Sequence, residues 1–224
     1  MSRLAIVIGA AFLAVPSFAH AQYLGRELPH TGTFEVSGGG LLTGGYSFET
    51  VSANETRNPT TGSGPLTLFQ GEPRLDGGGG AEAHLGVYLG RQVSVEGGFQ
   101  FSRPSLLVRT SNDFESAPDT TASASLTQYV IDGSLLYHFG SGRLIPFVSG
   151  GAGYLRQLIQ DGSTVETGNE IHGGGGVKYW LGAGRRFGVR AEVRLSSLSG
   201  GLSLDGTTKR RFVPTFSGGV AYLF

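Results

Sequence analysis

Cysteine is absent from the sequence, charged residues are scarce, and no long hydrophobic run follows the first 21 residues. The lack of cysteine excludes a disulfide scaffold, a cysteine-ligated zinc site and thiol catalysis. Lysine plus arginine number 17, as do aspartate plus glutamate. This balance argues against a protein that binds nucleic acid through a basic surface. Because every later apolar segment is shorter than the roughly 18 residues of a spanning helix, no transmembrane helix is predicted.

Glycine, in contrast, is abundant. It accounts for 39 of the 224 residues, more than twice the usual share of about 7%. The glycines follow no Gly-X-Y period and only 9 prolines accompany them, which excludes a collagen-like chain. Apolar residues at 39% and aromatic residues at 10% are too frequent for a disordered chain. The composition therefore indicates a folded protein that is rich in glycine and poor in charge.

Residues 1–21 have the pattern of a secretory signal peptide. Arg3 precedes an apolar run that ends at Val15, and Ala19 and Ala21 form the small-x-small cleavage pattern. The apolar run is shorter than the roughly 20 residues that a transmembrane anchor needs. No cysteine follows the cleavage site, so a lipoprotein signal is not expected. We predict an exported protein in which residues 22–32 form a periplasmic lead.

The rest of the chain alternates between apolar and polar residues, which is the signal of a half-buried β-strand. The clearest case is 187–195, where Val189 and Val193 share one face while Arg190 and Glu192 share the other. The faces of 145–158 are not assigned by the pattern. The eight predicted strands are 33–49, 82–89, 93–102, 127–139, 145–158, 171–181, 187–195 and 212–224.

The connections between these strands alternate between long and short. The long ones are 49–80, 108–124, 159–170 and 197–211, and the short ones are 90–92, 139–144 and 182–186. Short turns at one end and long loops at the other are typical of outer-membrane barrels, in which an even strand number puts both termini at the periplasmic side. Loop 49–80 is the predicted partner-binding element, because of its length.

Two closed barrels would give this alternation. A soluble, lipocalin-like barrel buries its apolar face around a ligand, whereas a membrane barrel turns that face to lipid. Small residues on the polar face favour the membrane barrel, because an eight-stranded interior is crowded; they are Gly86, Gly98, Gly174, Gly176, Gly188 and Gly219. Aromatic residues in the apolar phase near strand ends fit interfacial girdles, and include Tyr46, Phe48, Phe101, Tyr129 and Phe212. The predicted fold is all-β, an eight-stranded antiparallel up-and-down transmembrane β-barrel over residues 33–224.

The C-terminus ends within a strand on Gly219, Tyr222 and Phe224, with the two aromatics in alternation. This ending resembles the terminal assembly signal of bacterial outer-membrane barrels. The mature chain, including the segments 146–154 and 190–194, resembles the small families of the OmpA transmembrane domain, OmpX and the Opa-like surface antigens. The resemblance implies a monomer in the bacterial outer membrane that contacts outer-membrane lipid and is inserted by the barrel assembly machinery.

Charged residues on the polar face are predicted to pair across the barrel, because an unpaired charge in a narrow interior is costly. The predicted network is Glu96, Asp132, Lys178, Arg190, Glu192 and Arg194. Such a network would close the lumen, and whether a narrow channel conducts is left open. For Glu35, Glu49 and Glu82, an interior position and a solvated rim position both stay possible.

No catalytic, cofactor or metal site is predicted. His84, His138 and His172 lie on different strands without ligand spacing, so polar interior packing is expected of them. No G-x-S-x-G elbow occurs, and the glycine runs lack the phosphate-loop form. We predict a non-enzymatic protein with a structural or surface-interaction role. If it has an extracellular ligand, the long loops are expected to bind it. The alternatives are a soluble barrel that carries an apolar ligand and a barrel enzyme that modifies outer-leaflet lipid.

Overall fold

The computed structural model describes residues 29–55, 66–140, 142–159, 164–182, 184–204 and 209–224. The predicted signal peptide, with Ala19 and Ala21, and most of the predicted lead lie outside these residues. The regular structure in the described part is entirely β. Within the same ranges, no helix is long and apolar enough to cross a membrane.

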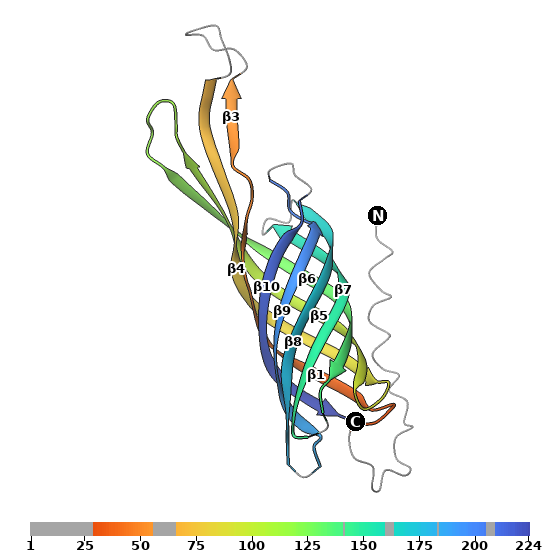
Figure 1. Ribbon diagram of the computed structural model, residues 1–224. Coiled ribbons are helices and arrows are strands. Elements are labelled where there is room, and N and C mark those ends of the chain that lie inside the picture. Colours follow the sequence, from red (N-terminus) through yellow and green to blue (C-terminus); the bar gives the residue numbers. More distant parts are fainter. Residues whose placement is uncertain (1–28, 56–65, 141, 160–163, 183, 205–208) are drawn as a thin grey trace, which may run out of the picture.

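Eight long strands form a closed ring (Figure 1). Each pairs with its sequence neighbours in antiparallel register, and β1 closes the ring by pairing with both β4 and β10. Closure leaves no free strand edge within the ring. The ring strands are β1 (Phe34–Thr43), β4 (Leu66–Tyr88), β5 (Val93–Ser111), β6 (Thr120–His138), β7 (Leu144–Ile159), β8 (Val165–Leu181), β9 (Phe187–Gly200) and β10 (Arg211–Leu223). Two short strands, β2 (Tyr46–Ser47) and β3 (Val51–Glu55), pair with β4. The predicted eight-stranded up-and-down barrel is confirmed.

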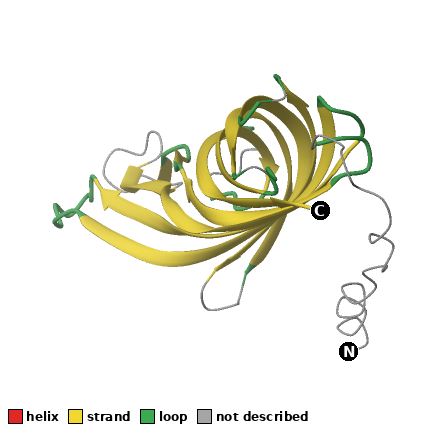
Figure 2. Cartoon of the chain, turned by 90° about the horizontal axis from the view of Figure 1, so that it is seen from below, coloured by secondary structure: helices red, strands yellow, loops and turns green. Residues whose placement is uncertain are grey.

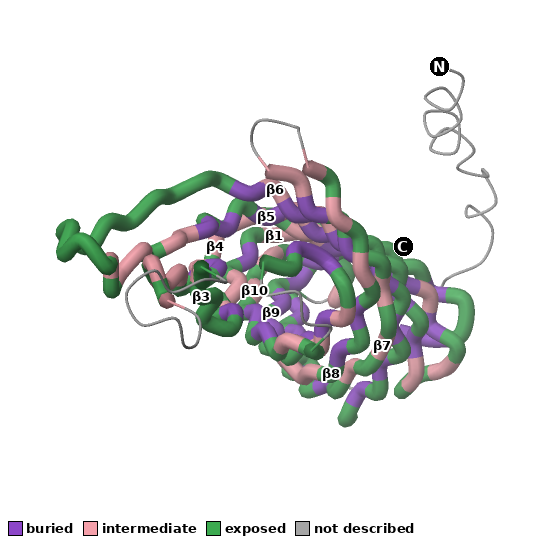
Figure 3. Tube along the Cα trace, turned by 90° about the horizontal axis from the view of Figure 1, so that it is seen from above, coloured by how far each residue is buried: buried purple, intermediate pink, exposed green. Residues whose placement is uncertain are grey.

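The apolar phase of the strands faces outward. Along β9, Val189 and Val193 are 44% and 51% exposed, while Arg190 and Glu192 between them are buried. The same alternation of exposed and buried residues runs around the ring (Figure 3). A barrel whose outer wall is apolar and whose interior is charged is the reverse of a soluble, lipocalin-like barrel. The soluble alternative is therefore wrong.

The strand whose faces the sequence left open, β7, is now placed. Ile145, Phe147 and Leu155 point into the barrel and are buried, whereas Val148 and Tyr154 point outward. Glycines and a serine occupy the inward positions between Phe147 and Leu155. These small residues leave room for side chains that cross the lumen from other strands.

Several predicted loops are largely strand. The sheet continues past the ring in residues 51–55, 66–76, 105–111 and 120–125. We call these segments, together with the turn 112–119, the arm. The arm rises from the end of the barrel opposite the C-terminus and leans to one side (Figures 1 and 2). Because the short turns of such barrels are periplasmic, the arm is on the extracellular side. Its Thr, Ser and Gly residues are typical of loops, yet their backbone groups form the hydrogen bonds of β-hairpins. Residues 56–65 of the predicted partner-binding loop lie outside the described part.

The outward positions predicted for Tyr46 and Phe48 are wrong. β1 ends at Thr43, and Gly44 and Gly45 separate it from the two-residue β2. After this interruption Phe48 points inward and is buried against Leu75, with Tyr46 packed beside it. These two aromatics therefore belong to the core at the barrel mouth and not to a lipid-facing girdle.

Candidate functional site

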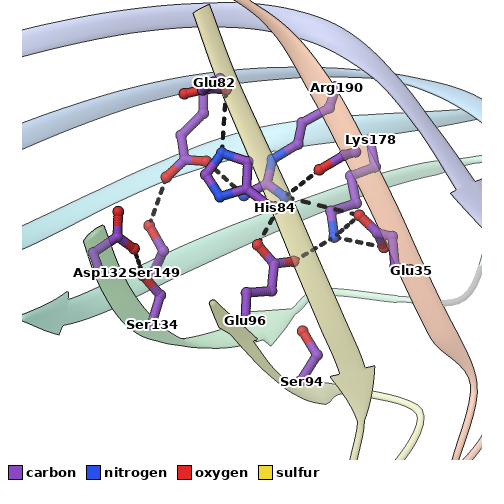
Figure 4. Close-up of polar contacts among 12 residues, drawn as sticks. Glu35, Glu82, His84, Ser94, Glu96, Asp132, Ser134, Ser149, Lys178 and Arg190 are labelled. Carbon is purple, nitrogen blue, oxygen red and sulfur yellow. Dashed lines mark hydrogen bonds and ion pairs between the residues drawn. The ribbon is translucent and has the colours of Figure 1, made fainter. Parts of the chain in front are cut away.

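A layer of charged side chains fills the middle of the barrel (Figure 4). It gathers residues from β5, β6, β8 and β9, whose polar phases all point inward. The six residues of the predicted network are Glu96, Asp132, Lys178, Arg190, Glu192 and Arg194, and each is at most 6% exposed. The structure brings all six together in this layer.

The contacts form one chain of alternating charge. The Lys178 ammonium donates a hydrogen bond to Glu96 Oε1 at 3.2 Å, and the Arg190 guanidinium donates to Glu96 Oε2 at 2.8 Å. Arg190 also donates to Glu192 at 2.7 Å. Arg194 lies 3.4 Å from Glu192 and 3.2 Å from Asp132. Each carboxylate but the last thus lies between two cations, which offsets the cost of burying the charges.

Further acids join this layer. Glu35, which the sequence left between rim and interior, is 2% exposed and accepts hydrogen bonds from Lys178 at 2.8 Å and from the Tyr88 hydroxyl at 2.9 Å. Glu82 is also interior, 3.4 Å from His84 Nε2. Glu49, in contrast, lies outside the ring and pairs with Lys209. The three undecided acids therefore divide into two interior groups and one exposed one.

Sequence reasoning missed Glu170, which belongs to a segment predicted as loop. It occupies an inward position of β8, and its Oε1 lies 3.1 Å from His172 Nδ1. The Ser196 hydroxyl donates to it at 2.8 Å. The apolar Ile171 lies between the polar residues Glu170 and His172, and Asn169 precedes them. This alternation was the signal that could have extended the predicted strand toward its N-terminus.

Apolar layers lie on both sides of the charges, which the sequence did not predict. Toward the periplasmic end, the buried cluster contains Tyr88, Ile145, Trp180, Ala221 and Leu223. Toward the extracellular end, a second cluster contains Val130, Leu155, Leu198 and Val213. A third, at the mouth, contains Phe48, Leu75, Leu106, Leu126 and Leu202. The charged network is therefore enclosed between hydrophobic layers along the barrel axis.

Three interior residues have the types of a catalytic triad. Ser134 Oγ lies 2.8 Å from His172 Nε2, and His172 Nδ1 lies 3.1 Å from Glu170. The Ser134 hydroxyl, however, also donates to Asp132 at 3.2 Å and the residue is buried. A lipid ester on the outer wall could not reach a hydroxyl inside the ring. No group of three metal-ligating side chains is found in the described part of the chain.

The residues of the predicted assembly signal lie at the closing seam. Gly219 pairs with Gly39 of β1 and faces inward, whereas Tyr222 and Phe224 face outward. The Phe224 amide donates to the Phe34 carbonyl at 2.9 Å. The rings of Tyr222 and Phe224 meet edge to face, with centroids 4.8 Å apart. The last residue thus links the two strands that close the barrel.

Comparison with known proteins agrees with this architecture. Among solved structures, the outer membrane protein OprG from Pseudomonas aeruginosa superposes with a TM-score of 0.56 at 13% identity, over 89% of this chain and 99% of that one. Neisserial surface protein A gives 0.54 at 15% identity, over 86% and 99%. These likenesses show the fold alone. No curated protein sequence matches the chain. The model of the outer membrane protein beta-barrel domain family matches residues 5–224. The chain therefore belongs to this family and is a β-barrel protein of the bacterial outer membrane.

Proposed function

We propose that the protein is a structural and surface-interacting component of the outer membrane, with a closed lumen and an arm that holds the partner-binding surface. In this proposal the chain acts as a monomer and carries no enzymatic activity. The observation that carries the proposal is the division of the molecule into a filled barrel and a sheet that projects from its extracellular end (Figures 1 and 2).

The charged network supports the closed lumen. Every link in the chain of pairs from Lys178 to Asp132 is 3.4 Å or shorter. A pore of useful width would have to separate these pairs and expose the apolar layers above and below them. Both changes are unfavourable, because unpaired buried charges and exposed apolar side chains each cost free energy.

The composition of the arm supports the surface-interaction role. Phe69 is 41% exposed and Phe114, at the tip of the β5–β6 hairpin, is 60% exposed, although neither is in the lipid-facing wall. A hollow of about 460 Å³ lies at the base of the arm, lined in part by Thr50, Arg74 and Arg109. Exposed aromatics beside polar groups are typical of protein-binding surfaces. A protein partner outside the cell fits these features.

A variant with Phe69→Ser and Phe114→Ser tests this role. We expect bacteria that display the variant to lose about tenfold or more of their binding to immobilised extracellular-matrix protein or to one another, because buried aromatic anchors carry much of the free energy of binding at such interfaces. The measurement is the number of bound cells at equal surface display, compared with cells that carry the unmodified protein.

Leu89→Ser is the matched control, since Leu89 is 56% exposed at the periplasmic end of the barrel. It should leave binding unchanged. If the double variant binds as well as the unmodified protein, or if neither protein promotes any binding, the surface role is wrong. The unmodified protein in planar bilayers should give no channel steps, and stable steps would contradict the closed lumen.

The C-terminal residue provides a separate test, of the predicted assembly signal. Deleting Phe224 removes an aromatic ring and the amide that bonds to Phe34. We expect several-fold less folded protein in the outer membrane, because insertion depends on recognition of this strand. The measurement is the heat-modifiable fraction on a denaturing gel. Phe187→Ala, which removes an exposed aromatic ring at the same end of the barrel, serves as the control. A normal folded yield without Phe224 would rule out the signal.

A further inference from the structure

Two arginines lie within strands on the outward face of the barrel. Arg103 of β5 and Arg156 of β7 both occupy exposed positions of the apolar phase. An arginine on the lipid-facing wall is unfavourable at the middle of the bilayer and becomes tolerable near its interfaces. Strand pairing places both near the extracellular interface. Arg156 pairs with Tyr129 only three rows below Leu126 and Ile159, where the β6–β7 ladder ends.

Both positive charges lie close to one row of paired residues across β5, β6 and β7, which lie side by side (Figure 1). Phe101 pairs with Tyr129, and Tyr129 pairs with Arg156. The Arg103 guanidinium lies over the Phe101 ring, 5.4 Å from its centroid, and so sits close to the same row. Two inter-strand spacings of about 4.8 Å separate Phe101 from Arg156, so the ends of the row are about 10 Å apart with Tyr129 between them.

No acidic residue of the described chain neutralises this row. Neither arginine makes an ion pair in the described ranges. The outward positions around Arg156 are taken by Tyr129, Tyr154, Leu158 and Thr167. Three nearby carboxylates already face other arginines: Asp76 contacts Arg74, and Glu72 and Asp119 contact Arg109. The row therefore presents two positive charges and a phenol hydroxyl at the level where the wall leaves the lipid.

We propose that this row binds the phosphate groups of a phosphorylated glycolipid of the outer leaflet. A guanidinium offers paired donors that match phosphate oxygens, and the Tyr129 hydroxyl adds a donor between the two arginines. Below the row, the exposed Phe99 and Ile131 give the acyl chains an apolar wall. The site depends on the outer-membrane location of the barrel and is independent of the proposed role of the arm.

The test compares the folded protein with an Arg103→Gln/Arg156→Gln variant, each in nanodiscs of zwitterionic phospholipid. The probe is purified lipopolysaccharide, intact or enzymatically dephosphorylated, and the measurement is the dissociation constant. We expect the double variant to bind intact lipopolysaccharide about tenfold more weakly or worse, because charge-assisted hydrogen bonds are lost. Unmodified protein should lose affinity similarly for the dephosphorylated probe. Inorganic phosphate at millimolar concentration should compete poorly, because it lacks the acyl chains.

Arg91→Gln/Arg186→Gln is the matched control, since it removes the same charge from exposed turns at the periplasmic end. It should bind like the unmodified protein. Arg103→Lys/Arg156→Lys keeps the charge and should bind with intermediate affinity, which preserves the test if the glutamine variant does not fold. Equal affinities for the unmodified protein and a folded glutamine or lysine variant, equal affinities for the two probes, or an equal loss in the control would each overturn the proposal. Complete competition by inorganic phosphate would also overturn it, because it would identify a simple anion site.

Discussion

Arg190→Met is expected to lower the free energy of unfolding by about 3–5 kcal/mol, the usual cost of breaking a buried ion pair from one side. The arginine donates to Glu96 at 2.8 Å and to Glu192 at 2.7 Å. Methionine replaces the aliphatic part of the arginine side chain but carries no charge, so both carboxylates would stay buried with one cation fewer. The measurement is urea-induced unfolding in lipid vesicles. Trp180, the only tryptophan and itself buried in the barrel, reports the transition by fluorescence.

Two further variants test whether the lost stability comes from the broken ion pairs. Arg186→Met changes an exposed turn residue and should shift the free energy of unfolding by no more than about 0.5 kcal/mol. Adding Glu96→Gln and Glu192→Gln to Arg190→Met should restore much of the lost stability, because the uncompensated carboxylates are then gone. If Arg190→Met unfolds at the same urea concentration as the unmodified protein, the network contributes nothing to stability and the pairs are incidental.

Gly39→Ala is expected to cost about 3 kcal/mol, the upper end of the usual penalty for overpacking. Gly39 faces inward on β1, and a Cβ there would overlap the Gly218 carbonyl oxygen and the Gly219 Cα of β10. Both are backbone atoms, so the strands themselves would have to move apart at the closing seam. Urea unfolding and the heat-modifiable fraction measure the result.

Gly97→Ala is the control for this substitution. Gly97 is also a strand glycine, but it faces outward and a Cβ there meets no atom within 4 Å. We expect it to be neutral or slightly stabilising, because alanine has less conformational freedom than glycine in the unfolded chain. Equal unfolding midpoints for the Gly39 and Gly97 variants would show that the seam tolerates separation.

Alternation made the ring predictable. Residues 187–195 have one apolar and one charged face, and the structure places them outward and inward. The same argument brought Arg190, Arg194 and Glu192 inside. It worked because the side-chain period in a strand is two, so one face of each strand follows directly from the sequence. Where each inward charge finds its partner depends on register across the barrel, which the sequence of a single strand does not contain.

Changes of phase account for most of what was missed. The register of β4 against β5 shifts between Asp76 and Gly79. As a result, the odd-numbered Leu75 points inward, whereas the inward residues further along the strand, such as Glu82 and His84, are even-numbered. Gly44 and Gly45 similarly shift Phe48 into the mouth. Each added residue inverts the faces of everything beyond it. Phe48 and Leu75 of the layer at the mouth lie beyond such shifts, so counting parity from the barrel places them outward. Leu106 and Leu126 keep the inward parity of their strands and were missed because they lie outside the predicted strand ranges.

The ion pairs join segments that are far apart along the chain. Glu35 on the first strand and Lys178 on β8 are separated by 143 residues. Of the interior acids, Glu35, Glu82, Glu96 and Asp132 come from the first half of the ring. The permanent cations Lys178, Arg190 and Arg194 all come from the second half, together with Glu170 and Glu192. The first half alone would therefore present only acids among these groups, whereas the second half would present a small excess of cations. Attraction between the two halves therefore favours the docking of β1 onto β10, and we expect the charges of the barrel to be neutralised as the ring closes.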